Sequence, residues 1–172
     1  MSIPLIPIIQ VSATVTNLTK LDLSIEQNVI ELPSKIQETS DKIKTYLLDF
    51  QDSLKEYTEE VVLPDEGLTY SDLKLLHKIH MNLIKFLLNK SKLTLSIVQN
   101  IKLFGEKIYL NHQLVKNNPQ KHQLNLSYEM CYPQMLLLIE NFSELIKILK
   151  EAKNNQNEII KQLNQRLNLL QS

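Results

Sequence analysis

The sequence contains only two glycines, one cysteine and no tryptophan. Glycine makes up roughly 7% of an average protein, and sheets and phosphate-binding loops need it at tight turns and where the backbone approaches a ligand. Its scarcity therefore argues against a sheet-based fold and against a glycine-rich catalytic loop. With Cys131 alone the chain cannot form an intramolecular disulfide bond, which is consistent with a reducing compartment.

Aromatic residues are also few, at 6% of the chain, and Arg166 is the only arginine. The chain is dominated by Leu, Ile, Lys, Asn, Gln and Glu, most of which are well tolerated in helix interiors. No stretch reaches the roughly 20 uninterrupted apolar residues that a membrane span requires. The apolar run at residues 3–9 lacks the preceding positive charge of a signal peptide. We therefore predict an intracellular, cytoplasmic protein built from helices with narrow aliphatic stripes.

Charged residues are sorted along the chain. Residues 22–66 hold twelve acidic residues and four lysines, a net charge of −8, whereas residues 73–122 hold nine lysines and one acidic residue, a net charge of +8. We predict that these two blocks form an antiparallel helical hairpin and face each other within the molecule. The alternatives for the basic block are an acidic partner protein, a lipid surface or nucleic acid. Nucleic acid is the poorest fit, because the basic block contains no arginine.

The apolar pattern predicts an all-α protein: an elongated helical bundle, or coiled-coil hairpin, of three long helices over residues 22–63, 69–116 and 133–171. These helices are expected to form one domain over residues 20–172. In the first helix, apolar residues recur every seven positions, as in helices packed along their length: Val29, Ile36, Ile43, Phe50 and Tyr57. The second helix begins with a capping box of Thr69 and Asp72, and Gly105 is the expected place for a bend.

Residues 1–19 carry no charge and are predicted to form a separate apolar arm. Pro4 and Pro7 oppose a regular helix at its start. The residues that follow alternate between apolar and polar in the period of an extended chain: Ile9, Val11, Ala13 and Val15 are the apolar members. The arm is therefore expected to lie extended along the helices, with Ile6 and Ile9 as its candidate contact residues.

The last helical segment carries an apolar stripe with one polar member. Its spacing of three and four residues runs through Leu145, Leu149, Gln156, Ile159, Leu163, Leu167 and Leu170. A polar residue in such a stripe lowers stability and can fix the register or the number of packed helices. We therefore predict that this stripe contacts other helical proteins, in a hetero- or homo-oligomer.

No arrangement of residues predicts catalysis. His77 and His80 lie three positions apart and could share a helix face, but neither has a glutamate three positions before it, as carboxylate-bridged metal sites in bundles do. Cys131 has no positively charged neighbour that would stabilise a thiolate. The sequence thus indicates a protein that is not an enzyme and holds no metal ion or other cofactor.

Two functions are consistent with these features. The first is a scaffold or adaptor subunit that assembles with other helical proteins through coiled-coil faces. The alternative is a membrane-active protein, such as a component of an α-helical pore former, in which the uncharged N-terminal segment inserts into a bilayer. Pro4, Pro7 and the Ser and Thr residues at positions 12, 14 and 16 make that segment a weak inserter, so the sequence favours the scaffold.

Overall fold

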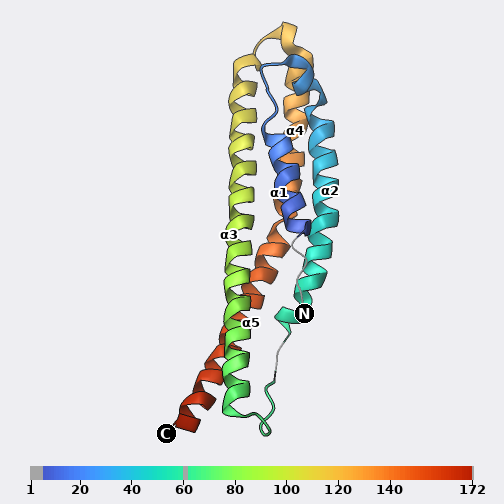
Figure 1. Ribbon diagram of the computed structural model, residues 1–172. Coiled ribbons are helices and arrows are strands. Elements are labelled where there is room, and N and C mark those ends of the chain that lie inside the picture. The colour runs from blue at the N-terminus through green and yellow to red at the C-terminus, as the bar shows by residue number, and fades with distance from the viewer. Residues whose placement is uncertain (1–5, 60–61, 172) are drawn as a thin grey trace.

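The computed structural model describes residues 6–59 and 62–171, and every regular element in that part of the chain is helical. The elements are α1 (Ile6–Thr19), α2 (Glu26–Thr58), α3 (Tyr70–Val115), the short 3-10 helix η1 (Pro119–Lys121), α4 (His122–Glu140) and α5 (Ser143–Gln171). Figure 1 shows an elongated bundle in which α1 and α3 run in one direction and α2, α4 and α5 run in the other. The all-α prediction is confirmed, but the described residues form five α-helices where three were predicted.

The predicted extended arm is wrong, because this segment forms helix α1. Four buried residues spaced by three or four positions line one face of it and are at most 3% exposed: Ile8, Val11, Val15 and Leu18. This face packs into the core against α2 and α3, so burial of a helical stripe outweighs the period-2 alternation. Pro7 lies in the first turn, where the missing N–H group costs no helical hydrogen bond. Pro4 and the rest of residues 1–5 lie outside the described part of the chain.

Helix α2 continues through Pro33 and ends at Thr58, a shorter span than the predicted 22–63. Its predicted stripe faces the core, since all of its members are buried: Val29, Ile36, Ile43, Phe50 and Tyr57. After α2 the chain turns back toward α3, and Gly67 adopts a φ of 91°, which glycine accepts without the strain that a side chain would cause.

Helix α3 is continuous over 46 residues, a length of about 69 Å at 1.5 Å per residue. The predicted capping box is present at its start. The Asp72 backbone N–H donates to Thr69 Oγ1 at 3.1 Å, and the Thr69 N–H donates to the Asp72 carboxylate at 2.9 Å. Gly105, expected as the place of a bend, does not interrupt the helix. Ile101 and Ile108, on either side of Gly105, are both fully buried and hold this part of the helix against the core.

The segment predicted as one helix over 133–171 begins earlier, at His122, and is divided into α4 and α5. Pro133 lies inside α4, so it does not begin the helix. Its side chain is exposed. The division falls at Asn141 and Phe142. Asn141 donates its side-chain amide to Ser40 Oγ of α2 at 2.9 Å, and Phe142 is fully buried. The junction between the two helices is therefore attached to α2 and to the core.

The helices that carry opposite charge do not face each other. In the half of the bundle that contains α1, α1 packs on α2 and α3, and α4 packs on the same two helices from the other side. Helix α5 packs on α2 and, most extensively, on α3 in the other half. Because α1 and the α4–α5 segment lie between α2 and α3, the predicted hairpin of these two helices is not formed.

This arrangement leaves most of the charge on the surface. Among the described residues, one ion pair joins the acidic and basic blocks, between Lys121 of η1 and Glu26 of α2 at one end of the bundle. No ion pair between described residues joins α2 to α3. The prediction that the two blocks face each other within the molecule is therefore wrong.

Candidate interaction surface

The stripe predicted to contact partners lies mostly inside the molecule. Five of its members are at most 2% exposed: Leu145, Leu149, Gln156, Ile159 and Leu163. They lie on α5, which packs against α3 and α2 of the same chain. Leu167 is partly buried beside them, and Leu170 is 56% exposed near the end of the helix. The apolar stripe of α5 therefore packs against helices of the same chain. Packing within one chain and packing between chains require the same spacing of apolar residues, so the spacing does not distinguish the two.

The polar member of that stripe, Gln156, pairs with His80 of α3. Gln156 Oε1 lies 2.5 Å from His80 Nδ1, and Gln156 is only 2% exposed. The contact therefore satisfies an amide that would otherwise be buried without a partner. His77 takes no part in it, and in the described chain no three His, Cys, Asp or Glu side chains gather as metal ligands do. The pair joins α5 to α3.

The two candidate residues of the N-terminal segment lie on α1. Ile9 is 57% exposed, and the side chain of Ile6 lies outside those that the structure describes. The opposite face of α1 belongs to the main core. In the described part of the chain, no helix combines the length and the apolar character needed to cross a bilayer.

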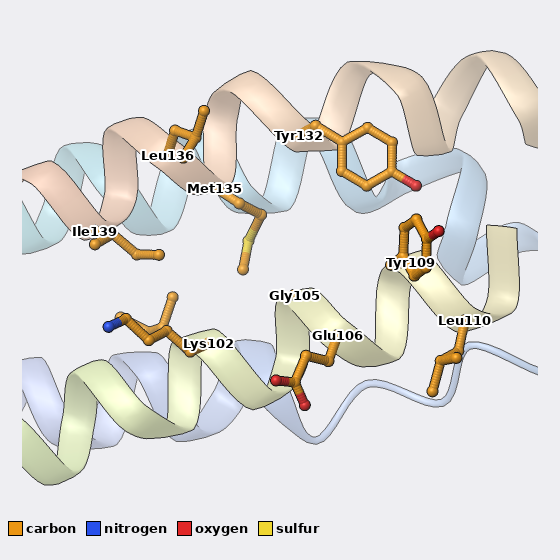
Figure 2. Close-up of a pocket in the computed structure, with 10 residues that line it drawn as sticks. Lys102, Gly105, Glu106, Tyr109, Leu110, Tyr132, Met135, Leu136 and Ile139 are labelled. Atoms are coloured by element: carbon orange, nitrogen blue, oxygen red, sulfur yellow. The ribbon is translucent and has the colours of Figure 1, made fainter.

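An apolar groove of about 680 Å³ lies between α3 and α4 (Figure 2). Figure 2 shows Met135 of α4 directed toward α3 near Gly105, and Tyr109 and Tyr132 facing each other at one end of the groove. The lining residues are Ile101, Lys102, Gly105, Glu106, Tyr109 and Leu110 from α3, and Tyr132, Met135, Leu136 and Ile139 from α4. A volume between roughly 300 and 1,000 Å³ is typical of binding sites in proteins.

The wall of the groove that α3 forms has no side chain at Gly105. A Cβ atom placed there would meet only the Met135 Cε atom, at 3.8 Å. Apolar side chains border the opening, with Tyr109 54% exposed and both Leu110 and Leu136 63% exposed. Contiguous exposed apolar surface of this kind is uncommon in monomeric proteins and marks interaction sites.

A second, smaller hollow of about 180 Å³ follows the same side of α3, between that helix and α5. Its lining residues are Leu88, Ser91 and Leu95 from α3, and Ile146, Leu149, Lys150 and Lys153 from α5. Figure 1 shows that α4 and α5 both run antiparallel to α3. The α3 residues that line the two hollows, 88–95 and 101–110, follow one another along that helix, so the hollows lie one after the other along one seam.

A buried histidine holds one wall of the larger groove. His112 is 5% exposed, its Nδ1 lies 2.6 Å from the Tyr132 hydroxyl, and its ring stacks on Tyr128 with 5.4 Å between the centroids. Burial raises the pKa of Tyr132, so the hydroxyl keeps its proton at neutral pH. These contacts fix the tyrosine ring at the rim of the groove.

Cys131 is fully buried, and burial raises its pKa to about 12. Its Sγ donates a hydrogen bond to the Ser127 carbonyl oxygen at 3.1 Å. The thiol is therefore protonated at neutral pH and inaccessible, which makes it unsuitable as a nucleophile.

Sequence reasoning missed the groove, because most of its lining residues lie outside the apolar stripes that identify the core; Ile101 and Met135, which belong to the core, are the exceptions. A signal was present, since the segment 69–116 carries apolar residues on more than one face, such as Leu75, Ile79 and Leu95. In the folded bundle these three side chains are 59%, 46% and 56% exposed. Apolar residues beyond the core stripe of a helix thus indicated surface available for contact.

Comparisons of the chain with protein-family models, with curated proteins and with solved structures found no match. The surface of the bundle is therefore the basis on which its function is inferred.

Proposed function

We propose that the protein is a non-enzymatic scaffold or adaptor subunit that assembles with other helical proteins. The observation that carries this proposal is the exposed apolar surface along α3 and α4. Leu110 and Leu136 are each 63% exposed beside the groove, although the chain buries an extensive core elsewhere. Grooves between helices accept the apolar face of an amphipathic helix, which is the partner structure that this surface fits.

In this proposal the partner packs in coiled-coil fashion along α3 and the α4–α5 segment. The stripe from Leu145 to Leu163 is occupied within the chain, so it supports the bundle that presents the surface. Ile9 of α1 and Leu170 near the end of α5 are exposed and remain candidates for further contacts.

The alternative of a membrane-active protein has less support. Insertion of the N-terminal segment would withdraw α1 from the core, where Ile8, Val11, Val15 and Leu18 are buried. Exposing four such side chains would cost roughly 1.5–3 kcal/mol each before any gain from the bilayer.

The experiment that tests the proposed function is affinity purification of the tagged full chain from its native cell extract, with quantitative mass spectrometry of the bound proteins. We expect one or more proteins with long helical segments at a fixed ratio to the chain. Recovery of the chain alone, at native abundance and in low salt, would refute the proposal.

A further inference from the structure

We propose that the seam between α3 and the α4–α5 segment binds one amphipathic helix of a different protein, and that acidic residues flank the apolar stripe of that helix. This inference rests on the proposed function and specifies the chemistry of the partner. It follows from the positions of the two hollows, from the charges at their edges and from the shape of the seam.

The two hollows lie where α3 has a small residue facing the seam. Ser91 lines the smaller hollow and Gly105 lines the larger one. These residues are two heptads apart, which corresponds to about 21 Å along the helix axis. Midway between them, Val98 is 8% exposed, belongs to the core and lines neither hollow.

A helix lying along the seam would therefore place a large apolar side chain in each hollow. Because packed helices keep matching spacing along their axes, these two anchoring residues should lie two heptads apart in the partner sequence. Leu88, Leu95 and Leu110 line the hollows from α3 and would pack against the rest of the partner's apolar stripe.

The charges at the hollows favour an acidic partner. Three lysines line the two hollows, namely Lys102, Lys150 and Lys153, against one acidic residue, Glu106. No ion pair between described residues involves any of these lysines. The glutamates of α5 recur every seven residues on a different face of that helix: Glu144, Glu151 and Glu158. The free ammonium groups would pair with Asp or Glu beside the partner's apolar stripe.

A second copy of this chain does not fit the site. Its acidic helix, α2, would supply the charge, but the stripe of α2 from Val29 to Tyr57 is buried in its own core. On the charged face of that helix, Leu48 is the large apolar residue that is exposed, at 51%. One leucine cannot fill two hollows that lie about 21 Å apart.

The shape of the seam favours a helix over a lipid surface. A bilayer is flat on this scale, so it would touch the ridges of α3 and α4 and leave the 680 Å³ groove between them unfilled. A helix is a convex rod of about 10 Å diameter and can enter the groove between two others.

The test uses the full chain, immobilised, and a displayed library of helical peptides about 21 residues long, six turns, with varied stripe and flanking residues. We expect the selected peptides to carry two large apolar residues two heptads apart, with Asp or Glu beside the stripe. The selected peptides are then synthesised, and their affinities for variants of the chain are measured by fluorescence anisotropy.

Two kinds of variant weaken binding if the inference is correct. Gly105→Leu fills the larger hollow, and the double variant Lys150→Glu with Lys153→Glu reverses the charge at the smaller one. Each should weaken binding by about tenfold or more. Lys161→Glu changes an exposed lysine of α5 that lines neither hollow, so it is the matched control and should bind as the wild type does. Circular dichroism and thermal unfolding verify that each variant is folded, and the charge variants remain informative if Gly105→Leu is not.

Several results would overturn the inference. These are selection of no peptide, selection of peptides with basic or neutral flanks, and equal binding to all variants. Lysine-dependent binding of phosphatidylserine vesicles in the absence of any selected peptide would assign the seam to a lipid surface instead.

The purification from native extract separates this inference from the proposed function. If the wild type and Gly105→Leu recover the same helical proteins at the same ratio, the scaffold function stands and the seam is not its site. If the wild type recovers no partner, the proposed function itself fails.

Discussion

Replacing His80 with leucine should destabilise the bundle more than replacing its hydrogen-bond partner, Gln156, with leucine. In His80→Leu the amide of Gln156, which is 2% exposed, loses the contact that His80 Nδ1 makes at 2.5 Å. A buried polar group left without a partner costs about 1–3 kcal/mol. The half-buried leucine at position 80 offsets part of that loss by burying apolar surface.

In Gln156→Leu the group left without a partner is His80, which is half-buried and can bind water instead. The new leucine continues the apolar stripe of Ala152 and Ile159, so we expect a change of at most about 1 kcal/mol in either direction. In the double variant no polar group is left unsatisfied, and its stability should equal or exceed that of the wild type. The two substitutions should therefore be coupled by about 1–2 kcal/mol.

The assay is urea unfolding of the wild type and the three variants, followed by circular dichroism at neutral pH with a common m value. If the effects of the single substitutions add to within about 0.5 kcal/mol, the contact contributes no coupling energy and the reasoning is refuted. Amide NMR spectra of the double variant give a second readout. If the polar pair fixes the register of α5 on α3, its removal should broaden or multiply signals from these helices even where stability rises.

Three further predictions concern other positions. Gly105→Ala should raise the free energy of unfolding by about 0.5–1 kcal/mol, because the residue is helical and the new methyl group would lie 3.8 Å from Met135 Cε. A free energy of unfolding in urea below that of the wild type would contradict this prediction. Asp72→Ala should destabilise the bundle near neutral pH. The hydrogen bonds from Thr69 lower the Asp72 pKa below 3.8, so its stabilisation is present above that value and is lost as the pH falls through the folded-state pKa. The difference between Asp72→Ala and wild type in urea unfolding should therefore shrink in acid, and a constant difference would be inconsistent with the capping box. Cys131, with a pKa of about 12, should resist Ellman's reagent at mildly alkaline pH in the folded protein and react on unfolding; rapid reaction of the native protein would show that the thiol is accessible.

Features that depend on a few neighbouring residues could be predicted from the sequence. The capping box at the start of α3 depends on two side chains three positions apart, Thr69 and Asp72, and it is present. The buried stripe of α2 was also predictable, because its seven-residue spacing extends over most of the helix. Such local signals need no knowledge of what packs against them.

The N-terminal segment shows where local pattern was insufficient. Residues 8–18 contain an alternating pattern and a pattern of threes and fours at the same time, and the sequence does not rank the two. The α-helix is the form that places Ile8, Val11, Val15 and Leu18 together against α2 and α3. Tertiary burial therefore decided the secondary structure of this segment.

The sequence by itself determined that most of the chain is helical, where α3 begins and ends to within one residue, and which apolar stripes of α2 and α5 pack against other helices. The tertiary structure decided which helices are neighbours, and it placed the acidic α2 away from the basic α3. The physical reason is the difference in energy between the two kinds of contact. Exposed ion pairs contribute about 0–1 kcal/mol each, whereas a fully buried aliphatic side chain contributes about 1.5–3 kcal/mol. Apolar packing consequently set the arrangement and left the lysines at the seam, and the hollows beside Ser91 and Gly105, on the surface.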